Sequence, residues 1–287
     1  MLDFIIQKEI ENFCQSKIIE IIPVSGGCIN SAFQVKTENK QTFFLKVNHS
    51  APDKMFEREA NGLSELKKSN AIILPDVIKA SNNFLILEFI KGGNKGRKFW
   101  QDFGQRFAIL HKFTSKKIGF YEDNYLGSNI QINSSYSLKN WAEFFYENRI
   151  LFQFRLSEKN NLADKTLRHG IKELEKIIHK ILDIRVVPSL LHGDLWAGNF
   201  LVDQTGNPCL IDPAVYYGHR EVDLAMTKLF SGFSNEFYES YNEEFPLEDG
   251  YEYRENIYKL YHVLNHLNLF GLSYYRQAIS LINYYLK

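Results

Sequence analysis

One segment, residues 192–213, restricts the possible folds of this chain more than any other because it spaces two acids and an amide around short apolar runs. It reads His-Gly-Asp-Leu-Trp-Ala-Gly-Asn and, after a turn, Leu-Ile-Asp-Pro, so that Asp194, Asn199 and Asp212 lie along it. The apolar runs before and after the turn predict two short strands of a hairpin. Such a hairpin would bring Asn199 back beside Asp212.

This spacing is typical of kinase-like phosphotransferases. A transferring phosphoryl group spreads negative charge over its oxygens, so the protein must position it, neutralise it and orient the attacking hydroxyl. We expect Asp194 to bind that hydroxyl and take its proton, and Asn199 and Asp212 to supply oxygen ligands to Mg²⁺. Each residue alone could be a turn former that bonds its own backbone. Their combination favours phosphoryl transfer.

A nucleotide-binding half is then expected upstream. Residues 20–24 and 32–36 predict two strands joined by a turn that contains Gly26, Gly27 and Cys28. Glycine has no Cβ, so such a turn can present backbone N–H groups to phosphate oxygens at close range. We expect these three residues to contact ATP, although an ordinary tight turn is the alternative.

Lys46 lies inside a strongly apolar predicted strand, residues 42–48. A lysine in such a run usually marks an exposed strand face. Here the predicted helix at 54–67 offers a carboxylate, and we predict that Glu59 pairs with Lys46 beside the ATP phosphates. Glu57 is the competing partner, but Glu59 precedes an apolar residue by one helical turn and shares its face.

The apolar run at residues 84–90, followed by two glycines, predicts a strand that leads into a hinge between two lobes. The backbone groups of Glu88, Phe89, Ile90 and Lys91 would then meet the edge of the adenine. A buried strand followed by an ordinary loop is the alternative.

Taken together, these motifs resemble the fructosamine kinase (ketosamine-3-kinase) family of the protein-kinase-like, aminoglycoside-phosphotransferase-like superfamily. The resemblance runs the whole length of the chain and is carried by residues 26–30, 44–48, 55–60, 191–199, 212–221 and 261–271. Its most specific parts are Trp196 and the Asp-Pro-Ala at 212–214, which stands where many kinases have Asp-Phe-Gly. These parts separate the chain from aminoglycoside and choline kinases.

The resemblance implies an α+β, bilobal protein-kinase-like fold. Residues 1–90 would form a small nucleotide-binding lobe with an antiparallel sheet plus a helix, and residues 91–287 a larger, mainly helical catalytic and acceptor-binding lobe. It also implies ATP-dependent, magnesium-dependent phosphorylation of the sugar 3-hydroxyl of ketosamines, the adducts formed by glycation. The 3-phosphates decompose and free the amine, so the activity would be a deglycation.

The resemblance also assigns roles. Asp194 matches the catalytic base, Asn199 and Asp212 the magnesium ligands, and Lys46 with Glu59 the phosphate-binding pair. We expect Trp196 to touch the sugar or its amine, because an aromatic face can stack on either; a core tryptophan is the alternative. His266 is a further candidate for the substrate site, although a lone histidine is more often structural. Asp223 is expected to open a helix and to brace the catalytic loop.

Composition narrows the function classes. With 34 basic and 34 acidic residues, the chain offers no general attraction for nucleic acid or an anionic membrane. Charged residues interrupt the first turns of the chain, unlike a secretory signal, so we expect a cytoplasmic protein. We also expect a monomer or a weak dimer. The expected substrate is a small-molecule or protein-bound ketosamine. Its three cysteines are too few and too scattered for a disulfide framework or a zinc site. Cys28 could be redox-sensitive in its turn.

The remaining patterns predict helices at 99–113, 138–154 and 165–184 and a Ser/Asn-rich connector at 128–137. Three functional alternatives stay open. One is a kinase for another hydroxylated amine, such as an aminoglycoside or a choline-like alcohol. Another is an ATP-binding pseudokinase without turnover, and the weakest is a protein kinase, for which residues 212–221 leave little room for an activation segment.

Overall fold

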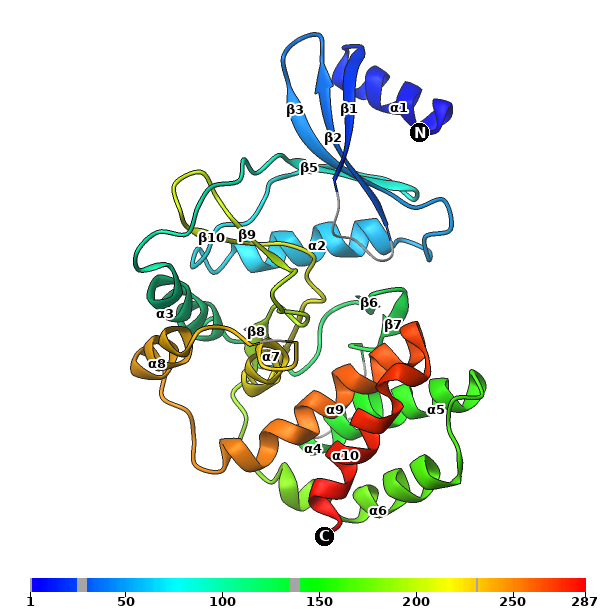
Figure 1. Ribbon diagram of the computed structural model, residues 1–287, viewed down its shortest axis with the longest axis vertical. Coiled ribbons are helices and arrows are strands. Elements are labelled where there is room, and N and C mark those ends of the chain that lie inside the picture. Colours follow the sequence, from blue (N-terminus) through cyan, green and yellow to red (C-terminus); the bar gives the residue numbers. More distant parts are fainter. Residues whose placement is uncertain (1, 25–29, 135–139, 231) are drawn as a thin grey trace.

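Five antiparallel strands form the sheet of the smaller lobe, in the order β1-β2-β3-β5-β4. The computed structural model describes residues 2–24, 30–134, 140–230 and 232–287. Figure 1 shows the smaller lobe at the top, with α2 running beneath the sheet, and a larger lobe of helices below it. The elements of the smaller lobe are α1 (Phe4–Cys14), β1 (Ile18–Val24), β2 (Ser31–Thr37), β3 (Thr42–Val47), α2 (Met55–Lys67), β4 (Val77–Ala80) and β5 (Phe84–Glu88).

The alternation of side chains along β3 decides which residues face which helix. Leu45 and its alternate neighbours pack against α1, in a core that includes Ile6 and Ile10. The opposite face of the sheet packs against Phe56 and Leu63 of α2. Lys46 therefore lies on the α2 side of the sheet's central strand.

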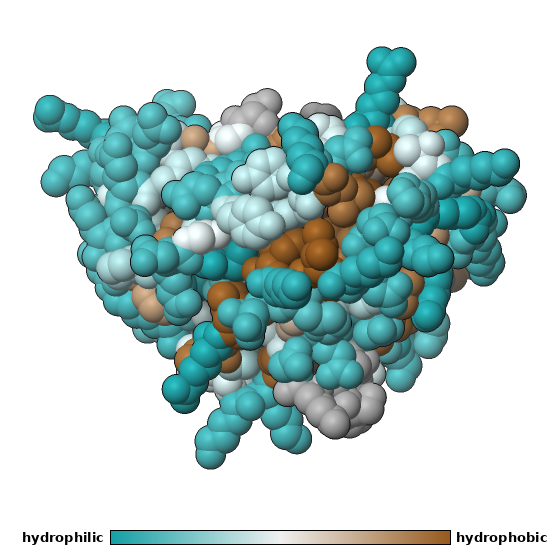
Figure 2. Space-filling model, turned by 90° about the horizontal axis from the view of Figure 1, so that it is seen from below, coloured by the Kyte–Doolittle hydropathy of each residue, from teal (hydrophilic) through white to brown (hydrophobic). Residues whose placement is uncertain are grey.

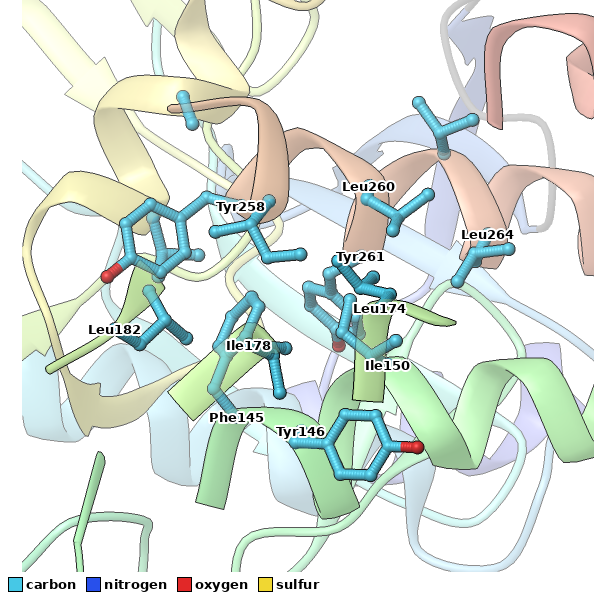
Figure 3. Close-up of a cluster of buried hydrophobic side chains, with 14 of the residues drawn as sticks. Phe145, Tyr146, Ile150, Leu174, Ile178, Leu182, Tyr258, Leu260, Tyr261 and Leu264 are labelled. Carbon is cyan, nitrogen blue, oxygen red and sulfur yellow. The ribbon is translucent and has the colours of Figure 1, made fainter. Parts of the chain in front are cut away.

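The larger lobe is built mainly from helices that pack around α9. Its elements are α3 (Phe99–His111), β6 (Asn124–Leu126), β7 (Asn129–Gln131), α4 (Trp141–Phe145), a π-helical segment (Tyr146–Leu151), α5 (Phe152–Lys159), α6 (Lys165–Ile181), β8 (Ser189–Leu191), β9 (Phe200–Val202), β10 (Pro208–Leu210), β11 (Tyr216–Gly218), α7 (Glu221–Thr227), α8 (Asn235–Glu244), α9 (Tyr251–Phe270), a 3₁₀ turn (Leu272–Tyr274) and α10 (Tyr275–Tyr285). Figure 3 shows the core of this lobe, where Phe145, Leu174, Ile178 and Tyr261 meet from α4, α6 and α9.

This architecture confirms the predicted α+β, bilobal arrangement. The hairpin predicted after Asn199 is also confirmed, since Leu210 of β10 pairs with Phe200 of β9. The predicted connector at 128–137 is partly wrong, because residues 129–131 form β7 and pair with β6. Residues 135–139, which include the predicted start of the next helix, lie outside the described residues. The division of the lobes between residues 90 and 91 stays a prediction.

The surface of the larger lobe is mostly hydrophilic at the end farthest from the sheet. Figure 2 shows this end, with hydrophobic side chains gathered near its centre. Within the described ranges, no helix is long and apolar enough to cross a membrane.

A buried ion pair anchors α7 to α9. Glu221, at the start of α7, accepts two hydrogen bonds from the guanidinium of Arg254, at 2.6 and 2.8 Å. The two residues are 1% and 5% exposed, so both charges have left water. Because α7 also carries Asp223, this pair supports the part of the lobe on which the loop between β8 and β9 rests.

Arg254→Met is expected to lower the free energy of unfolding by about 3–5 kcal/mol, because it leaves Glu221 buried without its cation. Urea denaturation measures this loss. Arg276→Met, on the exposed face of α10, is the matched control and should change stability by less than about 0.5 kcal/mol. Equal effects of the two substitutions would contradict the anchoring role of the pair.

Candidate active site

A cleft of about 600 Å³ lies between the lobes and receives side chains from both. The residues predicted from the sequence that line it are Lys46, Glu59, Glu88, Phe89, Ile90, Asp194, Trp196, Asn199, Asp212 and His266. Lys91 is exposed and, among the described residues, is not part of this lining. Gly26, Gly27 and Cys28 lie outside the described residues.

Lys46 connects the two lobes through a shared ion pair. Its ammonium donates to Glu59 Oε1 at 2.6 Å and to Asp212 Oδ1 at 2.6 Å. Burial alone would lower the pKa of Lys46, but the two carboxylates raise it above its ordinary value, so the side chain stays cationic. Glu57, the competing partner, is exposed on the other side of α2.

The loop between β8 and β9 requires a glycine at position 193. Gly193 has a φ of +84°, and a Cβ there would lie 2.0 Å from the carbonyl oxygen of Ala214. The same crossing is tied by the hydrogen bond from Ala214 N to His192 O, at 2.8 Å. Asp212 also has a positive φ, +57°, a conformation that Asp tolerates better than most residues. The backbone therefore has a positive φ on both sides of the site, at Gly193 and at Asp212.

Asp223 braces this loop, as predicted. Its carboxylate accepts the backbone N–H groups of His192 at 2.7 Å and Gly193 at 2.8 Å, and it contacts the ring of His111 at 3.2 Å. Burial opposes the charged form, but these hydrogen bonds hold the pKa of Asp223 below its ordinary value. The loop thus rests on a buried, ionised carboxylate.

The ring of His192 joins the loop that carries Asp194 to the segment that carries Asp212. Its Nε2 bonds to the carbonyl of Ile211 at 2.9 Å, which requires the proton on that nitrogen, while Nδ1 accepts from Asp194 N at 3.3 Å. Burial lowers the pKa of His192, which favours the neutral ring that this pattern needs. The imidazole of His192 therefore helps to fix the position of Asp194 relative to Asp212.

Asp194 and Asn199 face each other in the cleft. The amide nitrogen of Asn199 donates to Asp194 O at 2.8 Å and to Asp194 Oδ2 at 3.0 Å. Burial and the nearby charge of Asp212 raise the pKa of Asp194 well above its ordinary value, and the Asn199 amide opposes this. The amide oxygen of Asn199 is the atom that this arrangement leaves for a cation.

The donor set suits magnesium bound together with a nucleotide. Asn199 and Asp212 both line the cleft and offer hard oxygen atoms. In the part of the chain that the structure describes, no group of three or more His, Cys, Asp or Glu side chains could hold a metal ion by itself. Magnesium needs only one or two protein ligands when phosphates supply the others.

Beyond Asp194, the wall of the cleft is aromatic. Trp196 meets Phe230 at 6.1 Å between ring centroids, Phe230 meets His266 at 4.7 Å, and His266 meets Tyr274 at 5.1 Å. Gly198 makes room for Trp196, because a Cβ there would lie 2.4 Å from the indole. Trp196 is therefore a wall residue of the cleft and only partly buried.

His266 belongs to this wall. Its Nδ1 bonds to the carbonyl of His262 at 2.8 Å, and burial lowers its pKa, so the ring is neutral. Sequence reasoning missed Phe230 and Tyr274 because neither stands in a motif.

The fold and the cleft define a phosphotransferase of the protein-kinase-like class. The chain belongs to the fructosamine kinase family, whose model matches residues 1–287.

Relatives agree with this membership. A protein named "probable ketoamine kinase" from Enterococcus faecium is 39% identical over 272 residues, which are 92% of this chain and 94% of that protein. The chloroplastic protein-ribulosamine 3-kinase of Arabidopsis thaliana is 38% identical over 280 residues, 95% of this chain and 84% of the relative. The crystal structure of a candidate fructosamine-3-kinase from Haemophilus somnus superposes with a TM-score of 0.85, at 30% identity, over 98% of this chain and 97% of that one.

Asp223→Asn is expected to destabilise the protein by about 1–3 kcal/mol, because an amide offers one oxygen where two backbone N–H groups need an acceptor. Chemical denaturation measures the loss, and hydrogen exchange should show faster exchange at the amides of His192 and Gly193. Asp102→Asn, on the exposed face of α3, is the control. Unchanged exchange at these two amides would refute the bracing role.

Proposed function

We propose that this chain is an ATP- and magnesium-dependent kinase that phosphorylates the sugar 3-hydroxyl of ketosamines. One observation carries the proposal: the same cleft contains the Lys46–Glu59–Asp212 cluster, Asp194 and the aromatic wall. This wall is formed by Trp196, Phe230, His266 and Tyr274. The relatives' names, ketoamine kinase and ribulosamine 3-kinase, supply the substrate class.

The cleft suits an in-line transfer. Asp194 accepts a hydrogen bond from the 3-hydroxyl and takes its proton as that oxygen attacks the γ-phosphorus. The bond from the γ-phosphorus to the bridging oxygen breaks, and ADP leaves with that oxygen. Lys46, oriented by Glu59, balances charge on the phosphate oxygens. Magnesium held by Asn199 and Asp212 would neutralise charge on the β- and γ-phosphates.

The adenine is expected at the other end of the cleft. It is lined there by Glu88, the last residue of β5, and by Phe89 and Ile90, which follow the strand directly. Their backbone N–H and C=O groups can pair with the edge of the base, while the neighbouring apolar side chains cover its faces. Gly26, Gly27 and Cys28 lie outside the described residues and stay predicted as contacts of ATP.

The side chains that line the cleft favour a ketosamine over an aminoglycoside as the acceptor. The carboxylates among the described lining residues are Glu59, Glu88, Asp194 and Asp212, and the first and last of them already bind Lys46. A polycation would need more acidic groups than this, whereas a sugar joined to a single amine can stack on aromatic rings and use a cation–π contact. Trp196 is therefore proposed to contact the acceptor, with His266 beside it.

Turnover of a substrate series tests the proposal. The enzyme should phosphorylate ribulose-lysine or fructose-lysine on the 3-hydroxyl, as located by phosphorus NMR, and should leave choline and kanamycin unchanged. Asp194→Asn should lower kcat by about 10²- to 10⁴-fold while ATP still binds, because proton transfer is lost and Lys46 is untouched. Turnover of only choline or kanamycin would overturn the substrate class, and ATP binding without any transfer would indicate a pseudokinase.

Trp196→Leu should raise the KM for the ketosamine with little change in the KM for ATP, because the indole faces the acceptor side of the cleft. A stacking or cation–π contact contributes about 0.5–2 kcal/mol, which corresponds to a rise of about two- to thirtyfold. Trp196→Phe keeps an aromatic face and should recover part of the affinity. Equal effects on both Michaelis constants would instead assign Trp196 to the core.

A further inference from the structure

Helix α2 meets the larger lobe along one line of residues. Arg58 is followed three and four residues later by Asn61 and Gly62, and Glu65 lies three residues after Gly62, so the four residues share one helical face. Asn61 donates to Glu122 Oε1 at 2.9 Å, and Glu65 accepts from Tyr217 OH at 2.9 Å. These partners all belong to the larger lobe, so this face of α2, called here the docking stripe, lies across the boundary between the lobes.

The middle of the docking stripe packs against the segment that follows Asp212. A Cβ on Gly62 would lie 3.1 Å from Val215 Cγ2 and 3.8 Å from Pro213. The absence of a side chain at position 62 thus lets α2 approach this segment closely. Glu59 and Asp212, the two partners of Lys46, are carried by chain segments that touch each other directly.

Tyr125 holds the first turn of α2 from the opposite lobe. Its hydroxyl donates to the carbonyl of Asp53 at 2.9 Å, and its ring lies under the guanidinium of Arg58, 5.2 Å from the ring centroid. The residue before α2, Lys54, has a φ of +57° and gives the helix no side-chain cap. Contacts from Tyr125 therefore supply support that the helix start lacks.

The β6–β7 hairpin that carries Tyr125 is itself fixed to the catalytic segment. Asn124 donates to Val215 O at 2.7 Å, and Gln131 donates to Ala214 O at 3.0 Å and to Asn124 Oδ1 at 2.7 Å. These two polar side chains, and the residues whose carbonyls they reach, are buried, where each hydrogen bond is costly to lose. Figure 1 shows the hairpin directly beneath α2. One rigid unit thus contacts both the helix of Glu59 and the loop of Asp212.

We infer that Tyr125 of the larger lobe and Arg58 of α2 are positioning residues whose contact holds Glu59 against Lys46. Neither is assigned a chemical step, and the inference rests on the proposed function only where turnover is the readout. The contacts of the docking stripe keep α2 on the larger lobe, so the Lys46–Glu59–Asp212 cluster is already formed when no ligand is bound. Movement of α2 away from Lys46 would require the docking stripe to separate.

A double-mutant cycle with Glu59 tests this inference. Arg58→Met and Tyr125→Leu should each lower kcat by about three- to thirtyfold, the range of a lost cation–π contact. In a Glu59→Gln background the same substitutions should lower kcat by less than about twofold, because the group they position is already lost. Arg58→Lys, which keeps a cation over the ring, and Tyr125→Phe, which keeps the ring, should restore most of the rate.

The dissociation constant of Mg-ATP, measured by calorimetry without acceptor, gives an independent readout of the same cycle, since Lys46 is proposed to bind ATP whatever the acceptor. Losses of the same size in the native and Glu59→Gln backgrounds would overturn the inference and assign both residues to general stability. Arg106→Met, exposed on α3, is the matched control and should change neither constant. Absence of ketosamine turnover in the unmodified enzyme would refute the proposed function, while the calorimetric cycle would still decide the role of Tyr125 and Arg58.

Discussion

The ammonium of Lys46 is the point at which the sheet, α2 and the catalytic segment meet. It is 4% exposed and shares its charge between Glu59 and Asp212. A buried charge is tolerated only when it is paired and hydrogen-bonded, so the three elements cannot move apart without leaving a charge unpaired. The geometry of the cleft therefore depends on this one cluster more than on the apolar contacts around it.

The loops that carry Asp194 and Asp212 are held by a second set of buried polar contacts. Asp223 binds two successive backbone N–H groups, and His192 bonds to both Ile211 and Asp194. Gly193 is obligatory where two backbone segments cross. Because these contacts are buried and polar, each fixes a direction as well as a distance, which apolar packing would not do. Asp194 and Asp212 can then keep their separation although they follow different strands, β8 and β10.

Much of this site could be predicted because its residues stand in contiguous motifs. The Lys46–Glu59 contact follows from the lysine–glutamate pair typical of kinases together with helix periodicity. The approach of Asn199 to Asp212 follows from a single hairpin. The choice of Glu59 over Glu57 needed only the faces of one helix. Local sequence patterns were sufficient for these residues because each partner lies on, or beside, the next helix or strand along the chain.

The contacts of Tyr125 with the docking stripe, and two rings of the aromatic wall, could not be found in this way. Tyr125 stands in a three-residue strand that is too short for a periodic signal and borders a Ser/Asn-rich stretch typical of loops. Phe230 and Tyr274 become neighbours only after α7, α9 and the 3₁₀ turn have packed. Their roles are set by tertiary contacts across long separations, on which local propensity carries no information.

The charges of the cleft explain why a divalent cation is needed there. Among the described residues that line it, Lys46 is the one cation, against the carboxylates of Glu59, Glu88, Asp194 and Asp212. Burial, and after it the charge of Asp212, already raise the pKa of Asp194 well above its ordinary value. ATP would add several more negative charges at short range, where the low dielectric of a cleft strengthens repulsion. A cation that binds the oxygens of Asn199 and Asp212 would offset that repulsion and would lower the pKa of Asp194 by the same field, so nucleotide binding and activation of the base depend on one electrostatic change.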